Sequence, residues 1–253
     1  MIASAGTGTT TYFGDLADDG DYFDPKANFN LGLQYFFNNR IAARAELGWF
    51  QLEGNDANSK ESGKVNRNLS FSSNNFEFNI VGILQAWPDG VRYYQRKDFN
   101  IYGFAGIGVL YFNPKAELDG KKYALQPIKT EGVSYSRVTI VIPYGIGIKY
   151  KINPFWNIAL EGGFRQTFTD YIDDVSGTYI DNSSFSDPID AALADRRPEI
   201  GLQNKEAGDK RGEPTNNDNY FLYNLKVEFY LPASFFSTAK IKANRHSKKS
   251  RGR

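Results

Sequence analysis

Residues 27–52 read ANFNLGLQYFFNNRIAARAELGWFQL, two runs of alternating apolar and polar residues that meet at residues 38–40, Asn-Asn-Arg. Successive side chains of a β-strand point to opposite faces, so this period of two predicts two strands joined by a tight turn. One face of the pair is uncharged and rich in aromatic residues, whereas the other carries glycines, amides and charges. The stretch therefore predicts a sheet with two very different faces.

The same alternation recurs along the chain in eight segments of about ten residues. They are Ile2–Phe13, Ala27–Phe37, Ile41–Leu52, Asn74–Gln85, Ile101–Phe112, Thr139–Lys151, Trp156–Thr169 and Asn219–Leu231. Their connections alternate between short (38–40, 86–100, 152–155) and long (14–26, 53–73, 113–138, 170–218). This asymmetry is typical of outer-membrane barrels, which have short periplasmic turns and longer external loops.

The composition agrees with a barrel. No run approaches the roughly 18 consecutive apolar residues that a spanning helix needs, and aromatic residues make up 15% of the 253-residue chain. The sequence predicts an all-β fold, an eight-stranded antiparallel up-and-down transmembrane barrel over residues 1–231, followed by a tail over 232–253. We expect a bacterial outer-membrane location with both termini periplasmic, and a signal peptide removed before this numbering begins.

The two faces of the strands decide which side meets lipid. The uncharged face has residues such as Phe29, Leu31, Leu33, Tyr35, Leu47, Ile146, Ile148 and Leu160, and the opposite face interleaves glycines with polar residues. An eight-stranded lumen is barely wide enough for side chains, and glycines there make room for long polar neighbours. The polar face is therefore predicted to be the inside.

Charges on the predicted inner face balance in sign. They are Arg44, Lys149, Arg165 and Lys226 against Glu46, Glu77, Glu161 and Glu228. Because unpaired buried charge is costly, we expect a mutually paired plug and favour it over a proton or ion path. Aromatic residues near strand ends predict interfacial girdles: Tyr35, Phe37, Trp49, Tyr111, Phe112, Tyr150, Trp156, Tyr220 and Tyr230. Pro143 removes a ladder donor, so a bulge or a strand start is expected there.

Few residues in the sequence are candidates for catalysis or metal binding. The only histidine is His246 and there is no cysteine, which excludes His-dependent triads, thiolate sites and histidine-ligated metal within the barrel. The acidic loop residues Asp15, Asp18, Asp19, Asp21, Asp24, Asp170, Asp173 and Asp174 lack EF-hand spacing, so solvated charge is favoured over calcium binding. The adjacent pair Asp173 and Asp174 beside Tyr171 is a weak acid–base candidate. We predict no enzyme activity, metal or cofactor.

Two further segments carry hypotheses. Residues 186–197, SDPIDAALADRR, start like a capped helix, and a packed loop lid is favoured over a partner contact. The tail contains Lys240, Lys242, Arg245, Lys248, Lys249, Arg251 and Arg253 and no acid. It could bind an acidic partner, anionic headgroups or peptidoglycan-associated polymers, or be a disordered solubilising end; nucleic acid is not expected in this compartment.

Several runs together resemble one family. They are YFGDL (12–16), RNLSFSSNNFEFNI (67–80), YGFAGIGVLYFNPKA (102–116), LQPIKTEG (125–132), IPYGIGIKYKI (142–152) and FRQTFTDYIDDVSGTYID (164–181). They resemble the PorG family, the outer-membrane barrel of the type IX secretion system of Bacteroidota. The last run is the most specific, and the resemblance extends to about Leu231.

This resemblance implies a structural role. A PorG-like barrel would associate with the periplasmic ring formed by the PorK lipoprotein and PorN and tie that ring to the outer membrane, with protein secretion and gliding motility depending on it indirectly. No catalytic residues come with the family. Two alternatives stay open from the residues: an OmpW-like conduit for small apolar compounds, and a surface enzyme built on the long loops.

Overall fold

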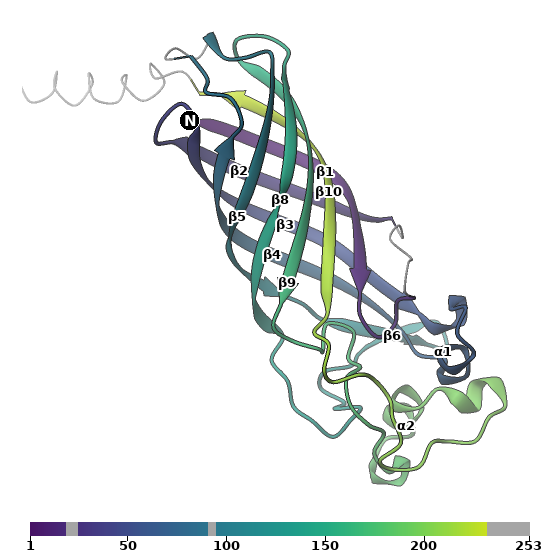
Figure 1. The fold of residues 1–253 in the computed structure, drawn as a ribbon. Helices are drawn as coiled ribbons and strands as arrows, with labels where there is room; N and C mark the ends of the chain where they lie inside the picture. The colour runs from purple at the N-terminus through teal and green to yellow at the C-terminus, as the bar shows by residue number, and fades with distance from the viewer. Residues whose placement is uncertain (19–24, 91–94, 232–253) are drawn as a thin grey trace, which may run out of the picture.

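The protein is a closed barrel of eight antiparallel strands, described here from a computed structural model covering residues 1–18, 25–90 and 95–231. The barrel strands are β1 (Ile2–Phe13), β2 (Lys26–Phe36), β3 (Ile41–Asn55), β4 (Ser70–Gln85), β5 (Phe99–Tyr111), β8 (Val138–Lys151), β9 (Trp156–Thr167) and β10 (Asn219–Tyr230). Neighbours in the chain pair with each other, and β1 pairs with β10 to close the sheet (Figure 1). The predicted fold is confirmed, with strand bounds close to those expected.

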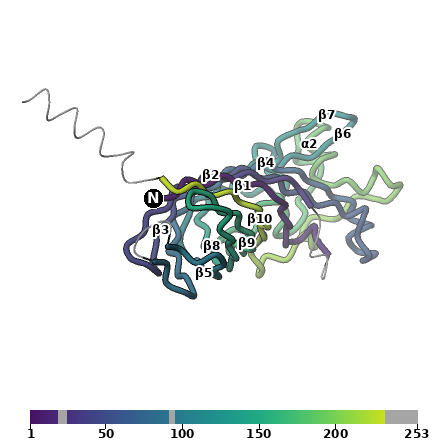
Figure 2. Tube along the Cα trace, turned by 90° about the horizontal axis from the view of Figure 1, so that it is seen from above, coloured from purple at the N-terminus to yellow at the C-terminus, as the bar shows by residue number. Residues whose placement is uncertain are grey.

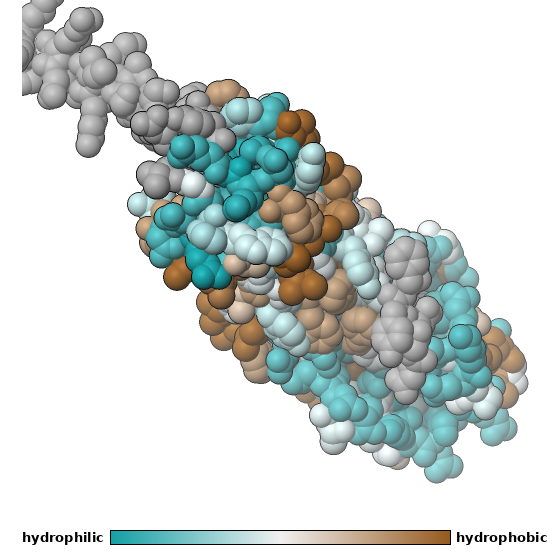
Figure 3. All heavy atoms as spheres, turned by 45° about the horizontal axis from the view of Figure 1, so that its top comes forward, coloured by the Kyte–Doolittle hydropathy of each residue, from teal (hydrophilic) through white to brown (hydrophobic). Residues whose placement is uncertain are grey.

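Alternation along each strand separates the wall from the lumen. In β4, residues from Phe71 to Gln85 alternate between buried and non-buried without a break. Outward apolar side chains stay largely exposed, for example Leu31 at 65% and Ile146 at 70%. Figure 3 shows apolar side chains gathered on the barrel wall, between hydrophilic ones at the two ends. A wall of this kind suits lipid, since soluble proteins seldom expose so large an apolar surface.

The two ends of the barrel differ. The end with connections 37–40, 86–98 and 152–155 and the chain start is called the turn end, and the opposite end is called the loop end. Elements of the loop end are η1 (Asp56–Asn58), α1 (Ser62–Arg67), the hairpin β6 (Pro114–Leu118) and β7 (Lys121–Ala124), η3 (Asn182–Ser184), α2 (Pro188–Ala194) and η4 (Arg197–Ile200). Figure 2 shows β6, β7 and α2 together at this end, far from the chain start. The loops thus form a structured cap.

The hairpin β6–β7 was not predicted. It extends the sheet beyond β4, through the pair Ser72↔Lys115. Its turn is Asp119-Gly120, and both residues have positive φ (52° and 76°), as a two-residue hairpin turn requires. Helix α2 does agree with the predicted short helix, with Asp187 accepting a hydrogen bond from the Ile189 amide and Pro188 in the first turn.

Two expectations about the wall were wrong. Phe112, Tyr220 and Tyr230 are buried rather than part of an outer girdle, because even-numbered residues of β5 and β10 face inward and the alternation extends to the strand ends. Pro143 lies inside β8 without a bulge: the pairs Ala105↔Tyr144 and Gly108↔Val141 keep one register, and only the pairing between them is missing. A proline without an N–H interrupts the ladder there without shifting it.

In the described part of the chain no helix is long and apolar enough to span a membrane.

Candidate functional site: the lumen and its two closed ends

The centre of the lumen holds four charged residues in contact. Arg44 Nη2 lies 2.6 Å from Glu161 Oε1, and Arg44 Nε lies 3.3 Å from Glu46 Oε2. Lys226 Nζ forms ion pairs with both Glu46 and Glu161. These side chains are at most 3% exposed. Two cations and two carboxylates that contact each other form a neutral cluster, and this compensates for much of the cost of burying them.

A second cluster lies nearer the loop end. Arg165 Nε is 3.3 Å from Glu77 Oε1, and the Tyr220 hydroxyl donates to Glu77 Oε2 at 2.6 Å. Asn79 Nδ2 also donates to Glu77, at 2.6 Å. The Tyr220 ring stacks on Phe50 with centroids 4.7 Å apart. The carboxylate of Glu77 is thereby satisfied from three sides, beneath a layer of aromatic rings.

The turn end is closed by two of the predicted inner-face charges, Lys149 and Glu228, together with two residues that sequence periodicity did not identify. Lys149 Nζ pairs with Asp89 at 3.7 Å, and Glu228 accepts a hydrogen bond from Asn157 Nδ2 at 2.8 Å. Arg96 folds in from the 86–98 connection, donates to the Pro154 carbonyl at 2.8 Å, and places its guanidinium 3.9 Å from the Tyr230 ring centroid. Asp89 and Arg96 lie in a non-repeating connection, so no sequence pattern pointed to them.

Glycines give this network its space. A Cβ built on Gly6 would lie 2.6 Å from Asn30 Oδ1 and 2.7 Å from Lys226 Cγ. At Gly147 a Cβ would lie 2.4 Å from the Tyr102 ring, whose hydroxyl donates to Glu161 at 3.1 Å. Both contacts are too short for any other residue without rearrangement. The glycines of the inner face therefore accommodate the long polar side chains opposite them.

Above the second cluster, a hydrophobic layer joins the barrel to the cap. Its buried members come from strands and loops: Tyr12, Leu16, Phe50, Leu52, Leu69, Phe71, Leu110, Phe112, Ala116, Leu125, Val141, Ile172, Val175, Leu193, Tyr220 and Leu222. Leu193 of α2 belongs to this layer, so α2 is packed as a lid. The lumen is thus closed by paired charge along its length and by packed apolar side chains at the loop end.

Arg211 organises the cap. Its Nη1 donates to Glu131 Oε1 at 2.9 Å and to the Asp174 carbonyl at 2.6 Å. The Glu131 carboxylate also accepts from the backbone amides of Ser176 and Gly177. Charge-assisted bonds of this kind are stronger than neutral ones. The loops 113–138 and 170–218, which are far apart in sequence, are therefore held as one unit.

The acidic group of the last loop is buried, which overturns the expectation of solvated charge. Asp173 and Asp174 are each 1% exposed and Asp170 is 7% exposed. Asp173 and Asp174 diverge: Asp173 accepts from the Tyr12 hydroxyl at 2.6 Å, whereas Asp174 accepts from Thr130 and from Tyr135. Adjacent carboxylates that point to different partners do not form an acid–base pair on one substrate.

The Tyr12 hydroxyl lies between two carboxyl groups. It is 2.6 Å from Asp173 Oδ2 and 3.0 Å from Asp218 Oδ1. A phenol has a single proton to donate, so one of the two contacts needs a protonated carboxyl. Burial raises the pKa of both Asp173 and Asp218 well above the usual range, and for Asp218 the neighbouring Asp173 carboxylate adds to the shift.

The first acidic loop is only partly described. Asp18 accepts from Ser59 Oγ at 2.5 Å and from the Lys60 amide at 2.7 Å, which ties it to the 53–73 loop. Asp19, Asp21 and Asp24 lie outside the described residues. Within residues 1–18, 25–90 and 95–231 no group of three or more His, Cys, Asp or Glu is arranged to hold a metal ion.

The seven cations of the tail also lie outside the described residues. They are Lys240, Lys242, Arg245, Lys248, Lys249, Arg251 and Arg253. The last described residue, Leu231, donates its amide to the Met1 carbonyl at 3.0 Å, at the turn end. Leu231, the residue before the tail, therefore lies at the turn end of the barrel.

Solved structures with a similar architecture are small outer-membrane barrels. Ail of Yersinia pestis is 13% identical, with coverage of 90% of this chain and 95% of that chain and a TM-score of 0.44. Neisserial surface protein A is 8% identical (91% and 96% coverage, TM-score 0.45), and OprG of Pseudomonas aeruginosa is 11% identical (91% and 95%, TM-score 0.42). These likenesses concern the fold alone.

No curated protein matches the chain in sequence. A family model described as a domain of unknown function, DUF6089, matches residues 4–188, which include β1 to β9 and most of the cap up to the start of α2. The chain belongs to the DUF6089 family.

Proposed function

We propose that this protein is a structural component of a type IX secretion system, an outer-membrane barrel that anchors the periplasmic PorK/PorN ring. The observation that carries the proposal is the filled lumen. Lys226, Arg44, Glu46 and Glu161 block the centre as a neutral, buried cluster, and the hydrophobic layer closes the loop end. A barrel filled in this way serves as a rigid membrane anchor rather than as a path for solutes.

The resemblance of several runs to the PorG family supports the choice of this machine. They lie in strands and in the cap, and the run 164–181 includes the buried residues Asp173 and Asp174. The exposed apolar wall supports an outer-membrane location, with lipid as its surroundings. With the short turns periplasmic, the turn end, where the described chain reaches Leu231, faces the compartment where the ring would lie.

Ring contact is assigned to the turn end and to the tail. Lys97 and Asp98 are exposed on the 86–98 connection, and Arg40 lies on the neighbouring turn. Arg40 donates to the Gln85 and Ala86 carbonyls, at 3.3 and 2.9 Å, so these two connections form one surface. A rigid rim with exposed charge next to a cationic tail is suited to an acidic protein partner.

The experiment is a mild-detergent pull-down from native membranes with quantitative mass spectrometry. The full chain is compared with a chain ending at Leu231, with a Lys97→Glu variant at the turn end, and with a matched loop-end control, Lys121→Gln/Lys122→Gln. Recovery of ring proteins with the full chain and the control, and loss on truncation or with Lys97→Glu, supports anchoring and locates the contact. Recovery of no ring protein with any chain refutes it.

Conductance separates this proposal from the OmpW-like alternative. In planar bilayers or liposome-swelling assays the purified barrel is expected to pass neither ions nor small solutes, because the lumen is closed at its centre and at the loop end. Reproducible permeability of the unmodified protein would favour the conduit instead.

A further inference from the structure

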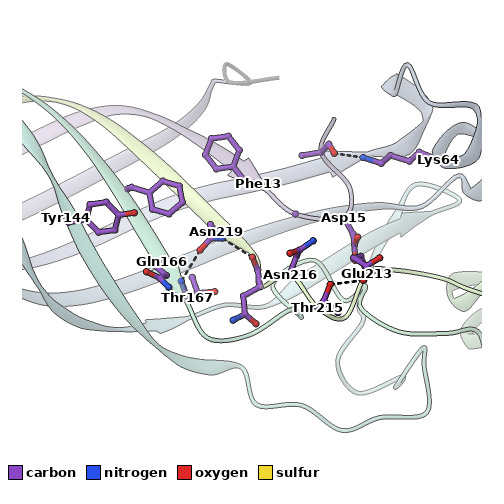
Figure 4. Close-up of a pocket in the computed structure, with 14 residues that line it drawn as sticks. Phe13, Asp15, Lys64, Tyr144, Gln166, Thr167, Glu213, Thr215, Asn216 and Asn219 are labelled. Carbon is purple, nitrogen blue, oxygen red and sulfur yellow. Dashed lines mark hydrogen bonds between the residues drawn. The ribbon is translucent and has the colours of Figure 1, made fainter. Parts of the chain in front are cut away.

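A polar pocket of about 600 Å³ opens at the loop end of the wall, where β1, β9 and β10 meet the cap (Figure 4). Its lining is rich in amides, hydroxyls and carboxylates: Asp15, Gln166, Thr167, Glu213, Thr215, Asn216, Asn217 and Asn219, with Lys64 at one side. Phe13, Tyr144 and Phe164 form the side nearest the barrel. We call this the rim pocket. Figure 4 shows Phe13 and Tyr144 on the barrel side and Asp15, Glu213 and Thr215 on the cap side.

Several polar groups in the rim pocket are available to a ligand. Asn219 is occupied, since its Oδ1 accepts from the Thr167 amide and its Nδ2 donates to the Asn217 carbonyl. The side-chain amides of Gln166, Asn216 and Asn217 make no hydrogen bond to any described residue, and all three are exposed. Each such amide offers both donors and acceptors. The pocket can therefore bond to a ligand that is itself both donor and acceptor.

An apolar groove of about 690 Å³ continues from the rim pocket down the wall. Its base is Gly162, which faces outward between Ile146 and Tyr223 in the sheet register. Ile148, Leu160 and Leu225 also line it. We call this the wall groove. Gly162 has no side chain, so the floor of the groove there is backbone, and the tip of the Phe221 ring stands 3.1 Å from where a Cβ would lie.

The rim pocket and the wall groove adjoin each other. Tyr144 and Phe164 line both of them. Their rings lie 5.5 Å apart, and Phe13 stacks on Phe164 at 6.1 Å. This aromatic pair marks the change from polar to apolar lining, the position at which membrane proteins place amphipathic rings. A site with one polar and one apolar half fits an amphiphile whose headgroup and chain occupy the two halves.

The charges in the rim pocket decide what kind of headgroup it fits. Asp15 and Glu213 are carboxylates, and the one cation in the lining, Lys64, already contacts Asp18 and donates to the Ala17 carbonyl. Glu213 accepts a hydrogen bond from Thr215 Oγ1 at 2.8 Å and pairs with Lys210 at 2.5 Å. Because the cation of the lining already has an acidic partner and the Asp15 carboxylate faces the pocket, the pocket disfavours a phosphate. Amides and aromatic rings instead suit an uncharged headgroup rich in hydroxyls.

We propose that the rim pocket and the wall groove together bind a glycolipid of the outer leaflet. An uncharged sugar of the lipid occupies the rim pocket and bonds to Gln166, Asn216 and Asn217, and one acyl chain lies in the wall groove over Gly162. The inference rests on the proposed function for one point, that the loop end faces outward in an outer membrane. It does not depend on ring anchoring.

The test is native mass spectrometry of the full-length protein in detergent, with monogalactosyl diacylglycerol as the probe. Diacylglycerol, free galactose and phosphatidylglycerol of matched chain length are the comparison ligands. The galactolipid is expected to bind at least tenfold more tightly than any of the three. Equal affinity for diacylglycerol would reduce the site to a nonspecific acyl groove, and preference for phosphatidylglycerol would contradict the headgroup assignment; either result overturns the proposal.

Two variants locate the binding. Gly162→Leu fills the wall groove; its Cβ would lie 3.1 Å from the tip of the Phe221 ring, which must turn slightly. Gly82→Leu is the matched control, since Gly82 also faces outward and a Cβ there meets only the Ala105 carbonyl at 3.7 Å. Gly162→Leu and Asn216→Ala/Asn217→Ala are each expected to weaken galactolipid binding about tenfold, and Gly82→Leu to leave it unchanged.

Folding is monitored by the heat-dependent shift of the barrel in gel electrophoresis, and only variants that keep it are compared. Equal binding by Gly162→Leu, by the asparagine double variant and by the unmodified protein would refute the site. Both sets of variants are expected to recover ring proteins as the unmodified chain does, so a failure of this proposal is distinguishable from a failure of the anchoring function.

Discussion

Arg44 and Glu161 are joined across the lumen, with Nη2 and Oε1 2.6 Å apart, although their strands β3 and β9 are not neighbours in the sheet. Lys226, from β10, contacts the same glutamate. The barrel is therefore connected through its interior as well as around its wall. Removing one partner of such a buried pair costs about 3–5 kcal/mol, because the remaining charge is left uncompensated.

Replacing Lys226 by Met is the first test of this interior connection. Among the described residues, the change leaves Glu46 and Glu161 with Arg44 as their only ion-pair partner, and we expect a loss of about 3–5 kcal/mol in the free energy of unfolding. Urea titration of the purified barrel in detergent measures it. Lys151→Met is the control, since Lys151 pairs with the exposed Asp98, and surface pairs contribute little.

Restoring charge balance should recover much of that loss. In a Lys226→Met/Glu161→Gln variant, Arg44 and Glu46 remain as one neutral pair, and we expect higher stability than with Lys226→Met alone. If Lys226→Met and Lys151→Met unfold at the same urea concentration, the lumen charges do not contribute as described.

Tyr220 tests the second cluster. Tyr220→Phe keeps the ring that stacks on Phe50 but removes the 2.6 Å hydrogen bond to Glu77. A hydrogen bond to a charged group contributes about 1.5–3 kcal/mol to stability, so Tyr220→Phe should lower the free energy of unfolding by that amount. Tyr150→Phe removes a hydroxyl from an exposed ring on the wall and should change little. If Tyr220→Phe and Tyr150→Phe change the free energy of unfolding equally, the hydrogen bond from Tyr220 to Glu77 does not stabilise the barrel as described.

The cap should lose stability as pH rises. Burial raises the pKa of Asp170 to about 7 and that of Asp174 to about 6, from an ordinary value of 3.8. The folded cap therefore holds protons that the unfolded loops release, and its stability is highest below about pH 3.8 and declines up to about pH 7. Hydrogen exchange of residues 170–218 between pH 4 and 8, corrected for intrinsic rates, measures this.

Asp170→Asn provides the control for the cap titration. An amide has no proton to lose, so the decline in protection should be shallower in this variant, particularly between pH 6 and 7. If protection from hydrogen exchange in the cap of the unmodified protein increased with pH, the predicted loss of cap stability at higher pH would be wrong.

Arg211 should hold the loops of the cap together. Arg211→Gln removes the ion pair with Glu131, and at least one of the bonds to the Asp174 and Ala194 carbonyls. We expect faster proteolytic cleavage within residues 113–138 and 170–218, with the barrel strands intact. Lys210→Gln is the matched neighbour, since Lys210 is exposed. Unchanged cleavage in Arg211→Gln would show that the loops are held by other contacts.

The sequence was sufficient to predict the strands. In a sheet with two unlike faces, buried and exposed side chains alternate from one residue to the next, as they do in β4 from Phe71 to Gln85. It also indicated the inward charges, since they share the face of the glycines. Their partners were not predictable. Glu161 contacts Arg44 and Lys226 because of barrel closure, and periodicity gives the face of a residue but not its height or its neighbour across the lumen.

The contacts of the loops were harder to predict because the loop sequences have no repeating pattern. Asp89 and Arg96 enter the lumen from a connection with no repeat, and Glu131 meets Arg211 over a separation of 80 residues. The turn Asp119-Gly120 did carry a recognisable hairpin signal. The buried aspartates were misjudged because charge runs are usually solvated, and only the packed cap reveals Tyr12, Thr130 and Tyr135 as their partners.

Pairing of β1 with β10 has a consequence for how the protein is made. Register runs from Ile2↔Tyr230 to Phe13↔Asn219, so the second edge of β1 stays uncovered until β10 has been made. Until then both edges of the sheet are templates for aggregation, and contacts between such distant residues form slowly. Closure of the barrel therefore has to wait for β10, and a chain that stops before β10 keeps two open sheet edges and is a substrate for chaperones and proteases.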